Sequence, residues 1–155
     1  MSHKNENIRK VYAQSKRVGP FKNENEVRQF SFLIDEPEKL GGTNQAPTPM
    51  EYVLGSFNGC ILIVIEMIAK EIDFTFTNLY ADTYGAIDRR GLFGTANVSP
   101  HFIEIKNTVY FETKESKAEL EILKEKVKER CPAYNMMNDA GVVITLDWKL
   151  NKEEK

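Results

Sequence analysis

The 155-residue sequence has few of the side chains that bind metals or crosslink small secreted proteins. It contains two cysteines, Cys60 and Cys131, and two histidines, His3 and His101. This inventory excludes a Cys₄ zinc site and a disulfide-dense scaffold, and we expect neither a metal nor another cofactor. It leaves room for one redox pair of cysteines.

An excess of charge of one sign is also missing. The chain has 21 Lys and Arg against 23 Asp and Glu, a net charge of −2. Nucleic-acid-binding domains usually carry a basic excess, so no nucleic-acid partner is expected. The content of 41% hydrophobic and 28% charged residues is typical of a globular protein. The length is typical of one domain, which predicts a single domain over residues 1–155.

No apolar run is long enough to predict a membrane span. The longest one begins at Ile61 and is interrupted by Glu66 and closed by Lys70. A membrane-spanning helix needs roughly 20 apolar residues. Residues 1–7 are polar and predict no signal peptide. These features favour a cytoplasmic location, where thiols stay reduced.

Apolar periodicity predicts an α+β fold. Strands are expected at 8–18, 26–35, 73–87, 101–112 and 141–150, and helices at about 48–71 and at 117–130. The segments 36–47 and 88–91 are expected to be a loop and a turn, and 91–99 a weak strand or a loop. This element order favours mainly antiparallel strands.

The first of these helices begins with strong signals. Thr48 can cap it, Pro49 suits the first helical position, and Glu51 completes a capping box. Its second half is apolar on nearly all sides, which predicts a buried central helix. Gly55 and Gly59 each cost about 1 kcal/mol relative to alanine inside a helix. They suggest a close approach by another element, a second subunit or a substrate.

Each cysteine has two interpretations. Cys60 lies mid-helix among apolar residues, and Cys131 ends the helix at 117–130 on its apolar side, just before Pro132. Either one alone could be a buried thiol that only packs. A reactive Cys60 requires a cation or hydrogen-bond donors beside it. A disulfide requires Cα atoms within about 7 Å, and the wide separation of the two residues in the sequence leaves that distance open.

Two motifs resemble those of OsmC/Ohr-type proteins. The segment Leu40–Leu54, LGGTNQAPTPMEYVL, followed by Asn58-Gly59-Cys60, resembles the signature that opens the family's central helix. The segment Arg130–Asn135, RCPAYN, resembles the family's second-cysteine motif. The resemblance implies a homodimer of intertwined subunits. In it a mainly antiparallel sheet wraps a long buried helix, and two active sites lie at the subunit interface.

The resemblance further implies thiol-dependent reduction of hydroperoxides, in defence against oxidative stress. Cys60 would be the peroxidatic thiolate that becomes a sulfenic acid, and Cys131 the resolving thiol that forms a disulfide with it. An external dithiol, lipoyl-linked in relatives, would restore both thiols. The apolar setting of Cys60 favours organic peroxides. Arg28 is our choice for the arginine beside the thiolate, because its position ahead of the second strand resembles that in relatives.

The acid that holds this arginine is less clearly marked. In the best-characterised peroxidases it is a glutamate ten residues before the first cysteine, and that position here is Met50. Glu51 is nine residues ahead of Cys60, a half-turn displacement on an unbroken helix. The supporting acid is therefore Glu51, Asp35 or Glu36, or it is missing. This pattern resembles a branch of the family other than its best-characterised peroxidases.

A second function fits the same residues. The protein could be a non-catalytic dimer of this fold that binds a small apolar or thiol-reactive ligand at the subunit interface. A third and weaker hypothesis is a structural stress protein with two inert core thiols. Rapid sulfenate formation at Cys60 would separate the first function from the other two.

Overall fold

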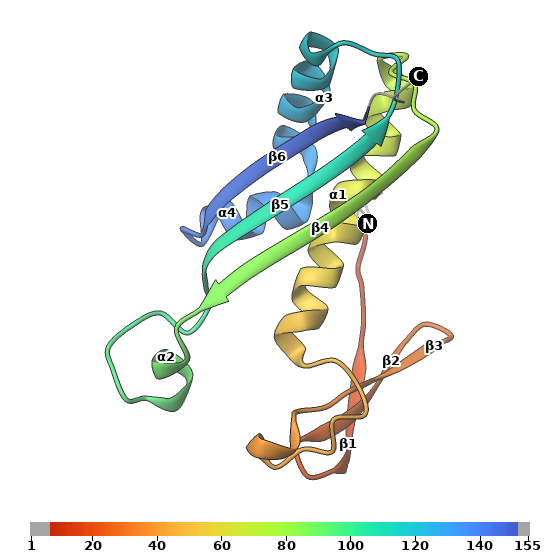
Figure 1. Ribbon diagram of the computed structural model, residues 1–155. Coiled ribbons are helices and arrows are strands. Elements are labelled where there is room, and N and C mark those ends of the chain that lie inside the picture. The colour runs from red at the N-terminus through yellow and green to blue at the C-terminus, as the bar shows by residue number, and fades with distance from the viewer. Residues whose placement is uncertain (1–6, 152–155) are drawn as a thin grey trace, which may run out of the picture. The chain divides into compact units, whose positions relative to one another are not determined.

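The computed structural model describes residues 7–151, so His3 and both ends of the predicted 1–155 domain lie outside the described residues. The chain forms two compact units that divide between Tyr52 and Val53. Both strands and helices are present, with a three-stranded sheet in each unit and a long helix (Figure 1). The α+β class expected from the sequence is confirmed.

The first unit contains an antiparallel sheet in the order β1-β2-β3. Its strands are β1 (Gln14–Gly19), β2 (Lys22–Val27) and β3 (Phe30–Ile34). The strand expected at 8–18 begins only at Gln14, and the one expected at 26–35 is divided by a turn at Arg28 and Gln29. The sequence did not reveal this hairpin because β2 reads KNENEV, which has no apolar alternation.

The loop after β3 is organised by one carboxylate. Asp35 is fully buried and accepts hydrogen bonds from the backbone N–H groups of Glu36 at 2.8 Å, Thr43 at 3.1 Å and Gln45 at 3.0 Å. The Thr43 hydroxyl donates a fourth at 2.6 Å. These bonds, led by that of the Thr43 hydroxyl, hold the pKa of Asp35 far below its usual value. The loop is thereby closed on itself.

Two glycines make this closure sterically feasible. Gly41 ends the short helix η1 (Glu38–Leu40) with φ of 94°, a conformation that glycine adopts without steric cost. A Cβ atom at Gly42 would lie 1.9 Å from the carbonyl oxygen of Glu36. The Gly-Gly pair is therefore required by the shape of the loop.

Helix α1 (Pro49–Glu71) begins where the sequence predicts. The Thr48 N–H donates to the Glu51 carboxylate at 2.7 Å, and the Glu51 N–H donates to the Thr48 hydroxyl at 3.3 Å. This reciprocal pair is the capping box read from the sequence, with Pro49 at the first helical position.

The second unit contains the sheet β4-β5-β6. Its strands are β4 (Asn78–Ile87), β5 (Phe102–Glu112) and β6 (Val143–Asn151). The β4 and β5 strands pair antiparallel, whereas β5 and β6 pair parallel. A parallel pair needs a crossover connection, here helices α3 (Lys117–Arg130) and α4 (Pro132–Asp139). The sequence missed α4, and a short helix α2 (Arg89–Phe93) replaces the turn expected at 88–91.

The core of this unit lies on one face of the sheet, which α1, α3 and α4 cover (Figure 1). The fully buried side chains of α1 are Phe57, Ile61, Ile65 and Ile68, and α3 adds Leu123 and Val127. By length and composition α1 could also cross a bilayer, with a mean hydropathy of 1.8. The core helix of a soluble protein can have the same composition, so length and composition alone do not assign α1 to a membrane; about 33% of its apolar window is buried in the described chain.

Replacing Asp35 by asparagine should destabilise the protein, because the new side chain would present an amide N–H₂ group to backbone donors. We expect the Tm at pH 7 to fall by several degrees. The pKa of Asp35 is lowered in the folded chain, so its stabilisation is present above the unfolded-state value near 3.9 and is lost as the pH falls below it. In thermal unfolding monitored by circular dichroism, the difference in Tm between the wild type and Asp35→Asn should become smaller below about pH 4. A difference in Tm at pH 3 as large as that at pH 7 would contradict this role.

Candidate functional site

The two cysteines of the chain meet in the second unit. The Sγ atoms of Cys60 and Cys131 lie 3.5 Å apart, and the Cys131 thiol donates to the sulfur of Cys60. Both are free thiols; Cys131 is fully buried and Cys60 is half-buried. A disulfide bond is about 2.05 Å long, so a small shift brings the pair into bonding distance.

Cys131 occupies the junction of two helices. It ends α3, where its N–H donates to the Val127 carbonyl at 2.8 Å, and it also precedes the first residue of α4, Pro132. Proline lacks an N–H and cannot continue α3, so the backbone turns extended at Cys131, with φ of −76° and ψ of 114°. The Cys-Pro sequence thus fixes where the chain bends and where the thiol lies.

Asn135 stabilises the bend. Its side-chain amide donates to the Lys128 and Cys131 carbonyl oxygens, both at 2.9 Å, and to the Glu129 carbonyl at 3.4 Å. The last carbonyls of a helix have no partners within it, so this one side chain satisfies groups that the break at Pro132 would leave unpaired. Asn135 belongs to the RCPAYN motif, but the sequence alone gave it no role.

Burial controls the protonation of Cys131. Removal from water raises the pKa of its thiol to about 11, and the neighbouring Cys60 acts in the same direction. The N–H groups of Tyr134 and Ala133, at the start of α4, oppose this rise in the pKa. Cys131 is therefore a protonated thiol at neutral pH, consistent with its role as hydrogen-bond donor to Cys60.

An ion pair joins the ends of the two helices that carry the thiols. The Arg130 guanidinium binds both carboxylate oxygens of Glu71, at 2.5 and 2.9 Å, linking the end of α3 to the end of α1. This contact lowers the pKa of Glu71 and raises that of Arg130. Both side chains are about half exposed, so water and salt screen the pair and its contribution to stability is small.

Arg28 and the candidate acids Asp35, Glu36 and Glu51 belong to the first unit. Arg28 is exposed in the β2–β3 turn, with φ of 57° and its guanidinium 5.0 Å from the centre of the Phe30 ring. Glu51 is in the capping box of α1, and Asp35 holds the loop ahead of it. The role of these residues at the thiols remains a prediction.

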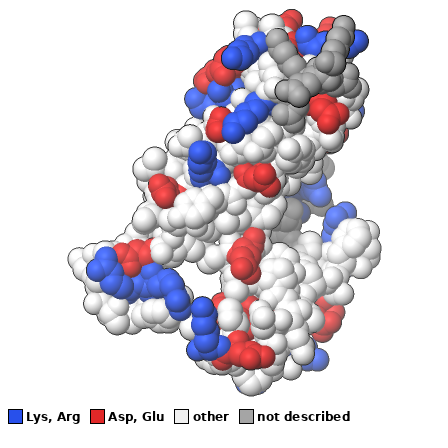
Figure 2. Space-filling view, in the orientation of Figure 1, with Lys and Arg blue, Asp and Glu red and all other residues white. Residues whose placement is uncertain are grey.

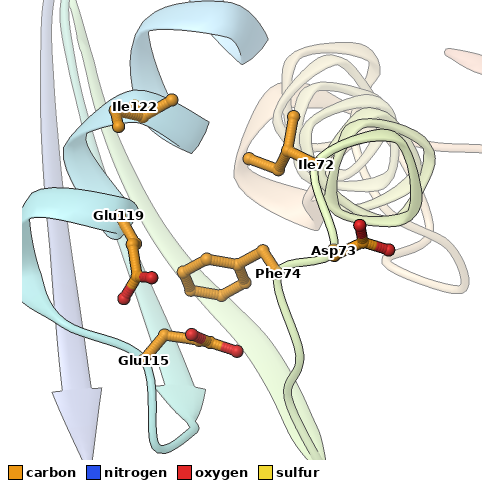
Figure 3. A pocket seen from close by; sticks show the side chains of 6 residues that line it. All are labelled: Ile72, Asp73, Phe74, Glu115, Glu119 and Ile122. Atoms are coloured by element: carbon orange, nitrogen blue, oxygen red, sulfur yellow. The ribbon is translucent and has the colours of Figure 1, made fainter.

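A separate cavity of about 150 Å³ lies in the second unit, where α1 leads into β4 beside the start of α3. Its lining residues are Ile72, Asp73, Phe74, Glu115, Glu119 and Ile122 (Figure 3). Two of the three lining acids serve local structure: Glu115 accepts from the N–H and hydroxyl of Thr75, and Glu119 belongs to the capping box of α3. Within residues 7–151, no group of three or more His, Cys, Asp or Glu is arranged to hold a metal.

Charges of both signs share the visible surface. Figure 2 shows Lys and Arg side chains interspersed with Asp and Glu over the visible face of the molecule. On α3, for example, Lys124 pairs with Glu121 and Lys128 with Glu125.

Solved structures share this fold. An OsmC-like protein from Mycoplasma pneumoniae aligns with a TM-score of 0.80 at 19% identity, over 92% of this chain and 97% of that one. An organic hydroperoxide resistance protein OsmC from Legionella pneumophila aligns with a TM-score of 0.72 at 16% identity, over 93% and 99%. An organic hydroperoxide resistance protein from Elizabethkingia anophelis, with thiocyanate bound, aligns with a TM-score of 0.72 at 15% identity, over 94% of this chain and 99% of that one. At these identities the likeness concerns the fold alone.

Sequence comparison identifies the family. Curated proteins give no match to the chain. The family model for OsmC-like proteins matches residues 42–147, which include both cysteines and extend from the Gly-Gly loop into β6. A match over that much of the chain shows what the two motifs indicated: the chain belongs to the OsmC-like protein family.

Proposed function

We propose that the protein reduces organic hydroperoxides through a Cys60/Cys131 redox couple, with an external dithiol as reductant. The observation that carries this proposal is the 3.5 Å separation of the two sulfurs, with the buried Cys131 thiol directed at Cys60. A cysteine that only packs needs no thiol partner. Membership of the OsmC-like family supports the same chemistry in general terms.

The proposed cycle has three steps. The Cys60 thiolate attacks one peroxide oxygen, the O–O bond breaks, an alcohol leaves after protonation, and Cys60 becomes a sulfenic acid. The Cys131 sulfur then attacks the Cys60 sulfur, a disulfide forms and water leaves, taking up the Cys131 proton. Two thiol–disulfide exchanges with a dithiol, lipoyl-linked in our proposal, restore both thiols and leave the dithiol oxidised. A cytoplasmic location, also proposed, would keep the couple reduced between turnovers.

Arg28 is the proposed cation that stabilises the thiolate and orients the peroxide. Its support is conformational. A non-glycine residue with positive φ costs about 1–2 kcal/mol, and such residues cluster at functional sites. Glu51 and Asp35 remain the proposed supporting acids, each in addition to its structural contacts.

We also propose that the protein is a homodimer in which the α1 helices pack together. Gly55, Gly59, Ile63 and Met67 form one stripe along α1, spaced by four residues. Ile63 is 61% exposed and Met67 50% exposed, and a Cβ at either glycine would meet nothing within 4 Å in the described part of the chain. Small residues allow close helix approach, so this stripe fits a second α1.

Cys60→Ser should abolish hydroperoxide consumption supported by a dithiol, because serine cannot form a sulfenic acid. Without reductant, Cys131→Ser should consume about one equivalent of peroxide per chain and hold Cys60 as a sulfenic acid, because Cys60 then has no internal thiol partner for the disulfide. Consumption of cumene hydroperoxide in the presence of dihydrolipoamide measures Cys60→Ser, and dimedone labelling with mass spectrometry measures the sulfenic acid in Cys131→Ser.

The matched control is Met136→Leu, which removes the sulfur of a residue that is 65% exposed. It should turn over as the wild type does, because the reaction does not involve methionine oxidation. Wild-type activity in Cys60→Ser would refute the proposed chemistry, and an inactive wild type would favour the non-catalytic binding function instead.

The raised pKa of Cys131 predicts slow alkylation. In Cys60→Ser, iodoacetamide at pH 8 should modify folded Cys131 more than about tenfold more slowly than Cys131 in the urea-unfolded chain, because burial leaves little thiolate. The rate should still be rising at pH 10, where an ordinary thiol with a pKa near 8.5 has levelled off. Mass spectrometry gives the rate, and a rate that has levelled off by pH 10 would contradict the assigned burial effect.

Ile63→Lys should convert the proposed dimer to a monomer, because it places a charge in the middle of the apolar α1 stripe. Sedimentation velocity at micromolar concentration measures the change in mass. Ile122→Lys is the matched control, since Ile122 is 54% exposed on a different helix, α3, and this variant should remain a dimer. A monomeric wild type would overturn the proposal.

A further inference from the structure

One polar side chain interrupts the apolar inner row of β5. The row consists of Ile105, Asn107, Val109 and Phe111, and none of these residues is more than 1% exposed. Burying an amide costs free energy unless its groups are hydrogen-bonded, and a β-branched residue would pack here without that cost. The presence of Asn107 therefore calls for an explanation beyond packing.

Asn107 lies at the centre of a hydrogen-bonded network that joins all three strands to α1. Its amide nitrogen donates to the Thr83 hydroxyl on β4 at 2.8 Å and to the Asn58 side-chain oxygen on α1 at 3.3 Å. Its oxygen accepts from the Trp148 indole on β6 at 3.4 Å. The Thr83 hydroxyl also donates to Asn58. Thr83 and Asn107 are directly opposite each other in the ladder.

The network restricts how α1 can move on the sheet. Asn58 is two residues before Cys60, on the same helix. Advancing α1 by one residue would move Asn58 by about 1.5 Å and 100°, breaking both of its bonds and leaving buried polar groups unpaired. Apolar contacts alone tolerate sliding better, because they have little directional preference.

The same sheet also supports Cys131. The helices on either side of this residue, α3 and α4, both contact β6, and Leu123 and Val127 of α3 are fully buried. The sheet is thus the common frame for both thiols. Because both thiols are held against this sheet, fixing the position of α1 on it also fixes the distance between the Cys60 and Cys131 sulfurs.

We propose that Asn107, Thr83 and Asn58 are positioning residues that set the geometry of the Cys60–Cys131 couple. The inference rests on the proposed function only in taking these two thiols as a redox couple. The sulfurs must move from 3.5 Å apart to a bond length of about 2.05 Å, so their starting positions matter. Misplacement of reacting groups by about 1 Å can lower the rate of an intramolecular reaction about a hundredfold.

The test is the thiol–disulfide equilibrium of the whole protein with glutathione. Cys60 and Cys131 together give up two electrons and two protons, and one oxidised glutathione takes them up to become two reduced molecules. Thr83→Val keeps the side-chain shape and removes the hydroxyl that links Asn107 to Asn58. It should lower the equilibrium constant for the protein disulfide about tenfold, which raises the reduction potential by about 30 mV.

Two variants serve as controls. Thr83→Ser retains the hydroxyl, and Ile105→Val removes a methylene from the same inner row without touching the network. Both should stay within about twofold of the wild-type constant. If Thr83→Val unfolds at lower temperature but keeps the wild-type constant, the network is only structural and the proposal is overturned.

A second network variant covers the case in which Thr83→Val does not fold. Asn58→Ala, at a half-buried helical position, should also lower the constant severalfold, and a wild-type constant in this variant would refute the proposal. The titration contains no hydroperoxide. If the wild type does not reduce hydroperoxides but Thr83→Val lowers the equilibrium constant for the disulfide, only the proposed function is refuted. If the wild type is active but Thr83→Val leaves the equilibrium constant unchanged, only the positioning role is refuted.

Discussion

The second unit depends on the burial of one face of the β4-β5-β6 sheet. Helices α1, α3 and α4 cover that face, and the parallel pairing of β5 with β6 requires the chain to cross over the sheet between these two strands. This crossover is the α3–α4 segment, which contains Cys131 at its break. The proximity of the two thiols is therefore a consequence of sheet topology, because α1 and the crossover share one apolar surface.

The features that the sequence predicted well are encoded over a few neighbouring residues. The capping box of Thr48 and Glu51 predicted a helix start that the structure confirms. Arg28 shows the opposite case. Its backbone adopts a left-handed conformation that turns the chain between β2 and β3. Arginine ordinarily disfavours this conformation, so its presence in the sequence did not predict the turn.

The features that sequence patterns could not yield depend on contacts between distant segments. The parallel register of β6 on β5 was missed, and the approach of the two sulfurs, now 3.5 Å, was implied only by the family resemblance, because both follow from packing between parts of the chain that are far apart in the sequence. Asn107 was missed as well. It could have been noticed as a polar residue in the row of Ile105, Val109 and Phe111, but its hydrogen-bond partners lie on three other elements and cannot be identified from the pattern.

The 71-residue separation of Cys60 and Cys131 has a consequence for the lifetime of the protein. A bond between them would close nearly half of the 155-residue chain into a covalent ring. In the chain-entropy model, a ring of this size destabilises the unfolded state by about 4 kcal/mol, because it removes conformational freedom there. The oxidised chain would resist unfolding, and hence proteolysis, better than the reduced one. Reduction by a dithiol would then also make the protein easier to degrade.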